Sequence, residues 1–289
     1  MPPMNRRTFI GTSVAATLVA SRPAWSATTH KIENLGVQLY TVRDAMKSDF
    51  EGTIAKVAAI GYREVEFAGY FDHSPKEVRE ILDRHHLTSP SEHVPYATVQ
   101  DKWQETLDAA HIVGQKFIVC PWIEESQRDS MDGWKRAADL FNHAGEASKK
   151  AGIQFAYHNH TFEFKSSKAL GGKIPYDFLL TQTDPALVKM EMDLCWITVA
   201  GSDPLTYFDK YPGRFPLVHV KDWSKDEHGS MGEKEGQMAD VGSGNIDYKR
   251  IFAQSGKAGI RHYFVEHDEP KSPLESLANS YKYLHALNF

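Results

Sequence analysis

The feature that most constrains the fold is a regular alternation of short apolar segments with amphipathic helical segments along nearly the whole chain. We predict strands in the short segments, because most of them are apolar and bounded by turn residues, and helices where apolar residues recur at helical spacing. The predicted strands are 35–39, 64–67, 88–93, 117–120, 155–160, 188–192, 216–220 and 263–265. The predicted helices are 50–60, 75–85, 100–113, 131–150, 176–180, 204–210, 248–258 and 273–287, and 223–245 is predicted as one long loop.

This order of elements predicts an α/β protein with a parallel sheet, because strands that alternate with helices pair side by side in one direction. Eight strand–helix units of roughly 30 residues each are typical of a single (β/α)8 TIM barrel, which we place at residues 32–289. An open, doubly wound sheet is the alternative. No Gly-x-Gly-x-x-Gly motif follows the first strand, so nothing in the sequence indicates a dinucleotide site.

Residues 1–27 resemble an export signal rather than part of the fold. Arg6 and Arg7 form a charged start, 11–20 is an apolar run, and Ser26-Ala27 provides a small-residue cleavage site. The paired arginines resemble a twin-arginine signal, so we expect export of the folded protein to the periplasm. An uncleaved membrane anchor is the alternative. The apolar run is short for a span of about 20 residues, so no stable membrane insertion is expected after cleavage.

The charge of the chain disfavours nucleic acid as a partner. The formal net charge is −5, and it becomes −8 when the three arginines of residues 1–27 leave with the signal. No long run of Lys or Arg indicates a nucleic-acid surface. We therefore expect a small-molecule partner, and the sequence leaves a homo-oligomer open.

The two cysteines, Cys120 and Cys195, each lie in an apolar, strand-like context. Two cysteines can form a disulfide in an oxidising compartment. The apolar surroundings favour two buried, unpaired thiols, and that is our prediction.

Potential metal ligands stand at the carboxyl ends of four consecutive predicted strands, at the points where the apolar runs end. They are His158, Asp193, His219 and Glu266. A single His or Asp after a strand is commonly a hydrogen-bonded turn residue. Four in succession at the carboxyl ends of barrel strands, where TIM-barrel active sites lie, predict a metal centre. Nitrogen and oxygen ligands without thiolate suit one divalent ion, Mn²⁺, Co²⁺, Mg²⁺ or Zn²⁺, and composition does not choose among them.

Five motifs carry a resemblance to a known family. They are 35–40 (Leu-Gly-Val-Gln-Leu-Tyr), 157–160 (Tyr-His-Asn-His), 192–194 (Met-Asp-Leu), 219–222 (His-Val-Lys-Asp) and 265–266 (Val-Glu). Over about residues 33–288 the chain resembles the xylose-isomerase-like TIM barrels, which include sugar phosphate isomerases/epimerases, inosose dehydratases and endonuclease-IV-type enzymes. In the epimerases a Glu, an Asp, a His and a Glu on strands five to eight hold one divalent metal. The resemblance implies that Asp193, His219 and Glu266 are the last three of these ligands.

The chain departs from the epimerase pattern at strand five, where His158 stands in place of the glutamate. In the epimerases that glutamate is also one of two acid/base carboxylates, so its loss disfavours symmetric proton exchange and adds weight to elimination. Glu163 is near enough in the sequence to restore a carboxylate, as a ligand or as a base. Cys195 and Trp196 replace the polar and basic side chains that follow the Asp in the epimerases.

These parts suit proton abstraction next to a carbonyl, with a metal that stabilises the enediolate as charge develops. We expect Glu266 to act as ligand and base, and Glu163 or His160 as the second acid/base group. Lys221 is expected to hold a substrate oxygen. The other predicted substrate contacts are His93, Glu66, Gln38, Trp122 and Trp196. For the aromatic side chains, core packing is an equal alternative.

The function favoured by these residues is a metal-dependent isomerase or epimerase of a keto-sugar or related polyol. A dehydratase or lyase acting on a keto-inositol or 3-keto-glycoside is the alternative, because the same proton abstraction begins an elimination. A non-catalytic periplasmic sugar-binding protein remains a more distant alternative. An abasic-site endonuclease shares the barrel, but it needs a basic groove that the acidic composition disfavours.

Overall fold

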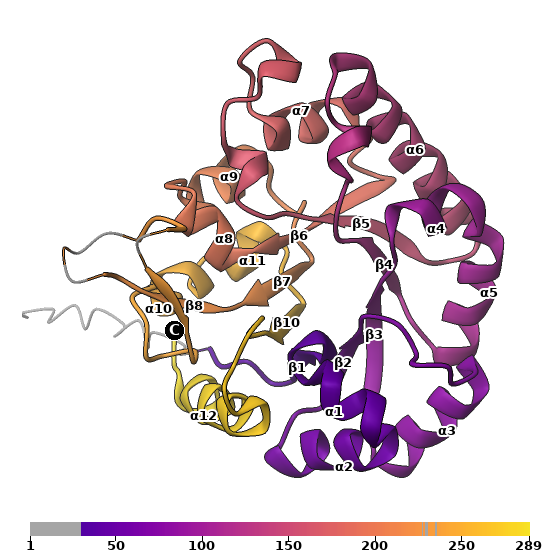
Figure 1. The fold of residues 1–289 in the computed structure, drawn as a ribbon, viewed down its shortest axis with the longest axis vertical. Helices are drawn as coiled ribbons and strands as arrows, with labels where there is room; N and C mark the ends of the chain where they lie inside the picture. The colour runs from indigo at the N-terminus through magenta and orange to yellow at the C-terminus, as the bar shows by residue number, and fades with distance from the viewer. Residues whose placement is uncertain (1–29, 227, 229–230, 235) are drawn as a thin grey trace, which may run out of the picture.

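Eight parallel strands close into a barrel that helices surround (Figure 1). The computed structural model describes residues 30–226, 228, 231–234 and 236–289, so the predicted export signal lies outside the described residues. The barrel strands are β1 (Leu35–Gln38), β2 (Glu64–Phe67), β3 (Thr88–His93), β4 (Phe117–Cys120), β5 (Gln154–His158), β6 (Val188–Asp193), β7 (Leu217–Val220) and β10 (His262–Val265). β10 pairs with β1 and closes the barrel. The predicted TIM barrel is confirmed and the open sheet is excluded.

The predicted helices are present, but two of them are divided, and the helices at 43–48 and 194–199 were not predicted. The α-helices are α1 (Arg43–Ser48), α2 (Phe50–Ile60), α3 (Pro75–Arg84), α4 (Tyr96–Asp101), α5 (Trp103–Val113), α6 (Met131–Lys150), α7 (Pro175–Gln182), α8 (Leu194–Val199), α9 (Pro204–Lys210), α10 (Tyr248–Phe252), α11 (Ser255–Ala258) and α12 (Pro273–Ala286). The short 3₁₀ helices are η1 (Leu39–Val42), η2 (Glu125–Gln127), η3 (Phe162–Phe164) and η4 (Lys168–Leu170). The predicted helix 100–113 is divided because Lys102 leaves helical geometry, with φ −135° and ψ 28°. The predicted helix 248–258 is divided between Phe252 and Ser255.

The segment predicted as one loop, 223–245, contains part of a two-stranded antiparallel sheet. β8 (Asp222–Ser224) pairs with β9 (Gln237–Ala239), and Trp223 lies opposite Met238. Each strand has three residues, which is too few for an alternation of apolar and polar residues to be recognised. β8 follows β7 almost directly, so this hairpin stands at the carboxyl end of the barrel.

The barrel interior changes from apolar to charged along the strands. Inward-facing residues recur at every second position of a strand. A separate buried cluster is formed by Phe117, Val119, Ala156, Leu217 and Phe264. His158, His219 and Glu266 stand two residues after Ala156, Leu217 and Phe264, respectively. The apolar layer therefore supports a layer of potential ligands at the carboxyl ends of the strands.

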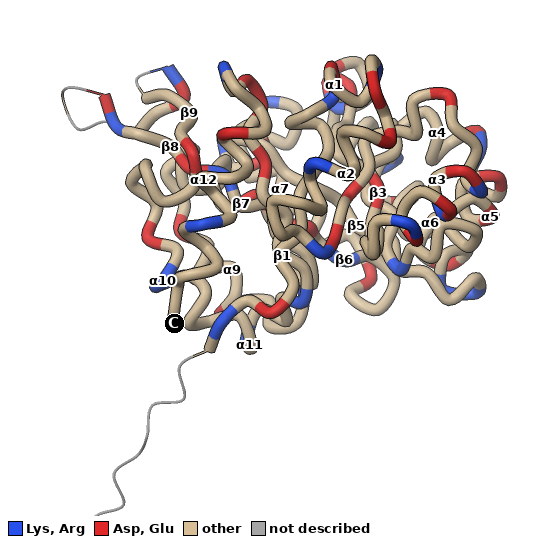
Figure 2. Tube along the Cα trace, turned by 90° about the horizontal axis from the view of Figure 1, so that it is seen from below, with Lys and Arg blue, Asp and Glu red and all other residues tan. Residues whose placement is uncertain are grey.

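Three further observations bear on the expectations from composition. Cys120 and Cys195 are buried and unpaired, as predicted. Among the helices that the structure describes, none is both long and apolar enough to cross a membrane. Figure 2 shows Lys and Arg interspersed with Asp and Glu along the described chain.

Gly36 provides a test of the packing inside the barrel. A Cβ atom at this position of β1 would lie 2.5 Å from Cδ1 of Phe264, which fills the apolar layer. We expect Gly36→Ala to lower the free energy of unfolding by about 1–3 kcal/mol, because this overpacking forces a neighbour to move. Urea denaturation measures the change.

Gly256 of α11 is the matched control. A Cβ atom at Gly256 would meet no atom within 4 Å, and Ala has the higher helix propensity. Gly256→Ala is therefore expected to leave stability unchanged or to raise it slightly. Equal destabilisation by both substitutions would contradict the packing account.

Candidate active site

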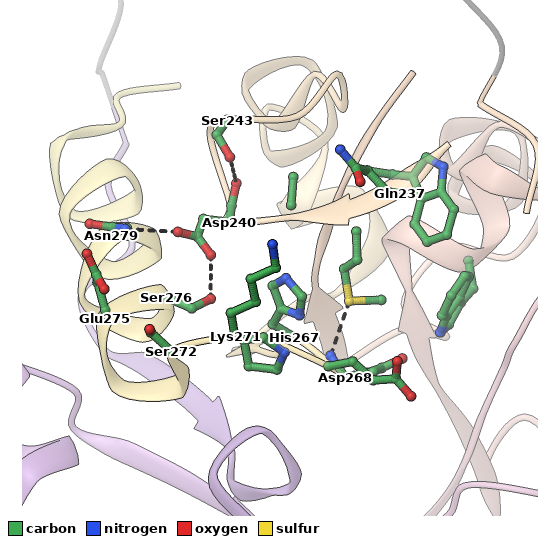
Figure 3. A pocket seen from close by; sticks show the side chains of 16 residues that line it. Gln237, Asp240, Ser243, His267, Asp268, Lys271, Ser272, Glu275, Ser276 and Asn279 are labelled. Carbon is green, nitrogen blue, oxygen red and sulfur yellow. Dashed lines mark hydrogen bonds between the residues drawn. The ribbon is translucent and has the colours of Figure 1, made fainter. Parts of the chain in front are cut away.

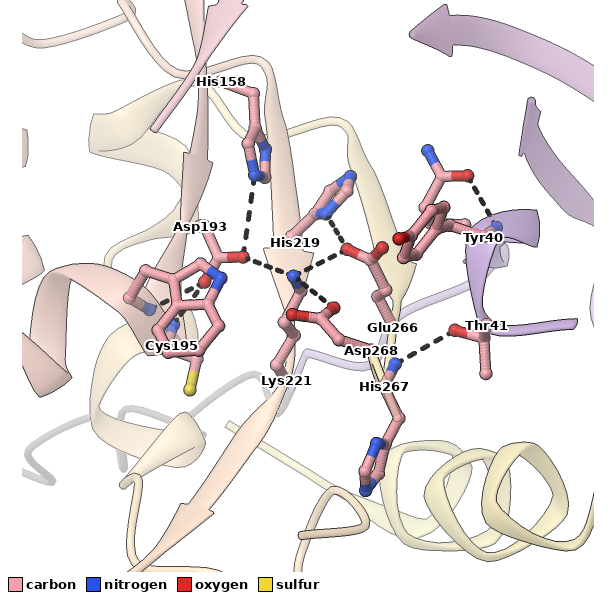
Figure 4. A network of polar contacts seen from close by, with 12 residues as sticks. Tyr40, Thr41, His158, Asp193, Cys195, His219, Lys221, Glu266, His267 and Asp268 are labelled. Carbon is pink, nitrogen blue, oxygen red and sulfur yellow. Dashed lines mark hydrogen bonds and ion pairs between the residues drawn. The ribbon is translucent and has the colours of Figure 1, made fainter. Parts of the chain in front are cut away.

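The inward-facing residues at the carboxyl ends of the strands form one buried network of charged side chains (Figure 4). The strand register sets the neighbours: Asp193 of β6 lies beside His219 of β7, and His158 of β5 lies beside Glu191 of β6. All four side chains are buried. TIM-barrel active sites lie at this end of the barrel, so this network is the candidate active site.

Three of the four predicted metal ligands form one cluster. Asp193, His219 and Glu266 each offer a ligand atom, and these atoms lie within 4.8 Å of one another. Nδ1 of His219 lies 2.7 Å from Oε2 of Glu266. Asp193 Oδ1 accepts hydrogen bonds from the backbone N–H groups of Cys195 and Trp196 at the start of α8. Its other oxygen, Oδ2, faces the network (Figure 4).

The fourth predicted ligand, His158, lies next to Asp193 but groups with a second cluster. Its Nε2 is 3.8 Å from Asp193 Oδ2, and its Nδ1 is 3.1 Å from Glu191 Oε2. The second cluster consists of His93, His158, Glu191 and His219. Burial, together with the nearby His219, holds the pKa of His158 well below its usual value. His158 is therefore neutral, which is the form of imidazole that binds a metal.

Glu191 belongs to the network, although the sequence analysis did not assign it a role. Its Oε2 lies 2.6 Å from Nε2 of His93 and 3.2 Å from Nε2 of His219. Its Oε1 is buried and has no hydrogen-bond partner among the described residues. Glu191 and Asp193 are two residues apart on one strand and so face the same way. That spacing was the available sequence signal.

Glu66 and Gln38, predicted as substrate contacts, are fully buried within the network. Gln38 Nε2 donates to Glu66 Oε2 at 2.8 Å, and the same oxygen lies 2.7 Å from Nε2 of His219. Burial opposes the charged form of Glu66, but His93 and His219 outweigh it and hold its pKa well below the usual value. Both residues contact other members of the network. Neither lines the cavity of about 460 Å³ that adjoins the network.

Lys221 places a buried ammonium group among three carboxylates (Figure 4). Its Nζ lies 2.8 Å from Glu266 Oε2, 2.8 Å from Asp268 Oδ1 and 3.2 Å from Asp193 Oδ2. The side chain is 2% exposed. Burial opposes the charge, but Glu266, Asp193 and Asp268 outweigh it and hold the pKa of Lys221 well above its usual value. The lysine therefore neutralises carboxylates that also belong to the predicted metal cluster.

For Asp193 and His93 as well, burial and the neighbouring charges shift the pKa in opposite directions. Burial raises the pKa of Asp193 to about 6, although Lys221 and His219 oppose the rise. Burial lowers the pKa of His93, but Glu66 and Glu191 outweigh it and raise the value to about 9. The network thus holds paired positive and negative groups.

The donor set of the first cluster fits a divalent metal ion. Asp193, His219 and Glu266 supply one nitrogen and two carboxylates, which suit the ions expected from the sequence. Nearby, the buried oxygens Glu66 Oε1 and Glu191 Oε1 have no hydrogen-bond partner among the described residues. Buried carboxylate oxygens left unpaired in this way call for a cation or water.

A cavity of about 460 Å³ adjoins the network. The predicted residues that line it are His93, His158, His160, Lys221 and Glu266. Four polar lining residues that were not predicted from the sequence are Tyr40, Arg43, Asp268 and Glu269. They come from η1, from the start of α1 and from the segment that follows β10 beyond Glu266.

Glu163 is buried and does not line this cavity. Its Oε1 accepts a hydrogen bond from the Tyr157 hydroxyl at 2.5 Å, and its Oε2 accepts the backbone N–H of His160 at 2.8 Å. It thereby fixes the turn that follows β5. Burial raises the pKa of Glu163 to about 7. His160 does reach the cavity, and burial lowers its pKa to about 3.

The two predicted tryptophans flank the site without lining this cavity. Trp122 packs edge-on against His160, with ring centroids 4.9 Å apart. Trp196 lies near Lys221, whose Nζ is 5.5 Å from its ring centroid. Trp196 also packs against Trp223 of the hairpin, at 5.4 Å between centroids.

Comparison with known proteins agrees with this geometry. The family described as "Xylose isomerase-like TIM barrel" matches residues 54–285. The chain belongs to this family. The resemblance drawn from the sequence motifs is thereby confirmed at the level of the family.

Related proteins in the family include enzymes with different reactions in their names. The inosose dehydratase of Lacticaseibacillus casei is 27% identical over 270 residues, which cover 82% of this chain and 89% of that protein. A sugar phosphate isomerase/epimerase structure from Parabacteroides distasonis is 27% identical, with a TM-score of 0.72, covering 90% of this chain and 96% of that one. The structure of the IolI protein with a bound zinc atom, 15% identical, has a TM-score of 0.66 and covers 86% and 95% of the two chains. At that identity it shows the fold alone.

Replacement of Lys221 tests whether its ammonium and a divalent ion neutralise the same carboxylates. Without metal, Lys221→Met leaves Asp193 and Glu266 buried beside an apolar side chain. We expect it to lower the free energy of unfolding by about 3–5 kcal/mol. With saturating Mn²⁺ the loss is expected to shrink, because the ion compensates both carboxylates. Thermal unfolding in EDTA and in Mn²⁺ measures both values.

Lys165→Met is the control for Lys221→Met, because Lys165 pairs with Glu233 at 2.9 Å on an exposed surface. It is expected to cost less than about 1 kcal/mol, with no dependence on Mn²⁺. If Lys221→Met were as mild as this control, or if Mn²⁺ left its destabilisation unchanged, the neutralising role of Lys221 would be wrong.

Glu163 predicts a pH dependence of stability. Its pKa rises from 4.5 to about 7 in the folded protein, so the folded state holds a proton that the unfolded chain releases in this range. The stability contributed by that proton is present below pH 4.5 and is lost as the pH rises to about 7. Glu163→Gln mimics the protonated acid. Relative to wild type it should gain roughly 3 kcal/mol between pH 4.5 and pH 8.

Urea denaturation of the metal-free proteins at a series of pH values provides the measurement for Glu163→Gln. Glu105→Gln, on an exposed position of α5, serves as the control and should follow the wild-type curve. Parallel curves for wild type and Glu163→Gln would show that the buried carboxyl does not carry this pH dependence.

Proposed function

We propose that the protein is a divalent-metal-dependent enzyme that removes a proton next to the carbonyl of a keto-sugar or keto-polyol and then eliminates a β-oxygen substituent. The observation that carries this proposal is the cluster of Asp193, His219 and Glu266 with Lys221 beside it, at the edge of a cavity of about 460 Å³. This volume is in the range of small-molecule sites. The kinship with inosose dehydratases and with sugar isomerases supports a carbohydrate substrate.

In this proposal Asp193, His219 and Glu266 hold the metal ion. The zinc in the IolI structure supports a divalent ion but does not choose among Mn²⁺, Co²⁺, Mg²⁺ and Zn²⁺. Such an ion, when bound, supplies Lewis-acid polarisation of the carbonyl and its neighbouring hydroxyl. His158 has its Nε2 directed toward Asp193, so it is the nearest additional nitrogen donor.

Glu266 is the side chain placed to take the proton. It lines the cavity, and its Oε2 is fixed by His219 Nδ1 at 2.7 Å and Lys221 Nζ at 2.8 Å. Burial opposes ionisation of Glu266, but Lys221 and His219 outweigh it and hold its pKa well below the usual value. The group is therefore a carboxylate at neutral pH. Lys221 lines the same cavity and can stabilise negative charge that develops on a substrate oxygen.

The side chains on the two sides of the cavity differ, and this difference favours elimination over epimerisation. Epimerisation needs acid/base groups on both faces of the reacting carbon. The strand-five position holds the neutral His158, and Glu163 is buried behind the β5 turn, so neither supplies a second exposed carboxylate. In an elimination, Glu266 takes the proton, the bond from the β-carbon to its oxygen breaks, and the electron pair leaves on that oxygen.

Isomerisation or epimerisation is the second candidate function, and His160 is the observation that favours it. Its Nδ1 is buried without a hydrogen-bond partner among the described residues, and its side chain lines the cavity. A neutral imidazole there can relay a proton to a substrate. The sugar phosphate isomerase/epimerase structure of similar sequence adds to this candidate.

The cavity favours an uncharged substrate over a sugar phosphate. Arg43 is the one arginine among the residues that line it. Its guanidinium already donates to the backbone oxygens of Tyr40 and Asp268 at 2.9 and 2.8 Å. Phosphate recognition typically uses free guanidinium forks or backbone N–H groups.

Glu266→Gln tests the proposed base directly. We expect the metal-loaded variant to lose at least about 10³-fold in turnover of a keto-sugar, because the amide cannot accept the proton. Glu269→Gln is the matched control, since Glu269 lines the same cavity but is exposed, and its turnover should stay near the wild-type value. A Glu266→Gln variant with wild-type turnover would rule out the proposed base.

The same assay in deuterated water separates the two candidate functions. Elimination releases water or an alcohol and leaves an α,β-unsaturated ketone that absorbs in the ultraviolet. Isomerisation or epimerisation instead places deuterium next to the carbonyl of an otherwise intact sugar.

A further inference from the structure

A second cavity, of about 770 Å³ (Figure 3), shares lining residues with the first. It lies between the hairpin strand β9, the segment that follows β10, and the beginning of α12. Asp268 and Glu269 line both cavities. The two spaces are therefore neighbours with one short segment between them, and the proposed reaction needs only the smaller one.

The segment between the cavities is fixed by Asp268, which is bound at three atoms. Its Oδ1 accepts from Lys221 Nζ at 2.8 Å, and its carbonyl oxygen accepts from Arg43 Nη1 at 2.8 Å. Its backbone N–H donates to Sδ of Met238 in the hairpin at 3.1 Å. A molecule that extends from the reaction centre into the second cavity therefore lies against this fixed segment, beside Lys221.

The walls of the second cavity combine aromatic side chains with separate hydrogen-bonding groups. Trp196 and Trp223 line it on the hairpin side, and they pack against each other. Gln237, Lys271 and Asn279 also line it, and the Lys271 side chain extends into the space (Figure 3). Aromatic surface with a few polar groups is typical of a small-molecule site. It suits a polyhydroxylated ring, which has both C–H faces and hydroxyl groups.

We infer that the second cavity binds the leaving group of the substrate, a second sugar ring or similar polyol joined through oxygen, so that the preferred substrates are keto-glycosides. This inference rests on the proposed elimination. Loss of water from a free keto-sugar gives a leaving group that fills none of this space. Loss of a glycosyl or polyol substituent gives one that does.

The step is balanced without any further reagent. Glu266 removes the proton next to the carbonyl, a carbon–carbon double bond forms, and the bond between the β-carbon and the linking oxygen breaks. The electron pair leaves with that oxygen. The proton removed from carbon ends, by way of water, on the departing oxygen, so the products are an unsaturated keto-sugar and a free alcohol.

Binding of unreactive sugars tests the second cavity independently of turnover. The probes are α- and β-linked glucose disaccharides, with glucose as the one-ring reference, titrated calorimetrically into the metal-loaded protein. We expect at least one disaccharide to bind about tenfold more tightly than glucose, and Lys271→Ala to remove most of that advantage. Lys271 is exposed, so its loss should not impair folding. Trp223→Phe is a second variant, which should weaken the binding of disaccharides but not that of glucose.

Lys282→Ala is the matched control, because Lys282 is an exposed lysine of α12 that does not line this cavity. It should bind disaccharides as the wild type does. If no disaccharide binds more tightly than glucose, or if Lys271→Ala and Lys282→Ala behave alike, the second cavity is not a sugar subsite.

Turnover of oxidised sugars then separates this inference from the proposed function. For keto-disaccharides, Lys271→Ala should lower kcat/KM about tenfold while leaving that of a one-ring keto-sugar unchanged. Equal kcat/KM for one-ring and two-ring keto-substrates, with neither changed by Lys271→Ala, would overturn the subsite and leave the elimination intact. Disaccharide binding without proton loss from any keto-substrate would instead overturn the proposed function.

Discussion

The structure depends on mutual neutralisation of charges at one end of a closed barrel. Carboxylates from β2, β6 and the end of β10 lie beside imidazoles from β3 and β7 and beside the Lys221 ammonium. A buried carboxylate without such a partner costs several kcal/mol. Because the residues lie on different strands, these ion pairs join one segment to another. The register of the whole barrel brings each charge to its partner, and the apolar layer beneath holds that register.

The fold could be predicted from the sequence because most strands are short apolar runs that stop at a polar residue, although β3 (Thr-Ser-Pro-Ser-Glu-His) is not. The polar residues that end these runs identified Asp193, His219 and Glu266 as candidate ligands, since barrel closure brings the strand ends together. Glu191 could not be found this way because Met190 and Met192 enclose it within an apolar run. The remaining sequence signal was its two-residue spacing from Asp193, and the strand register with β5 and β7 shows its inward direction directly.

The region after β5 shows why sequence distance is a weak guide to geometry. Glu163 lies five residues beyond His158, near enough to have replaced the missing strand-five carboxylate. The 3₁₀ turn η3 carries it into the protein, where it holds Tyr157 and the His160 backbone. Two imidazoles, those of His158 and His160, thus line the side of the cavity where the resemblance to the epimerases implied a carboxylate. The preference for elimination rests on this local turn.

The Lys221 ammonium also bears on how the protein folds in the absence of a metal ion. Proteins that fold around a structural ion stay unfolded until that ion arrives. Here an internal counter-ion already compensates Asp193 and Glu266, and Asp268 offers the lysine another carboxylate. In the proposed metal-dependent enzyme, the barrel can therefore form before the ion binds. Folding and metal binding are then separate steps.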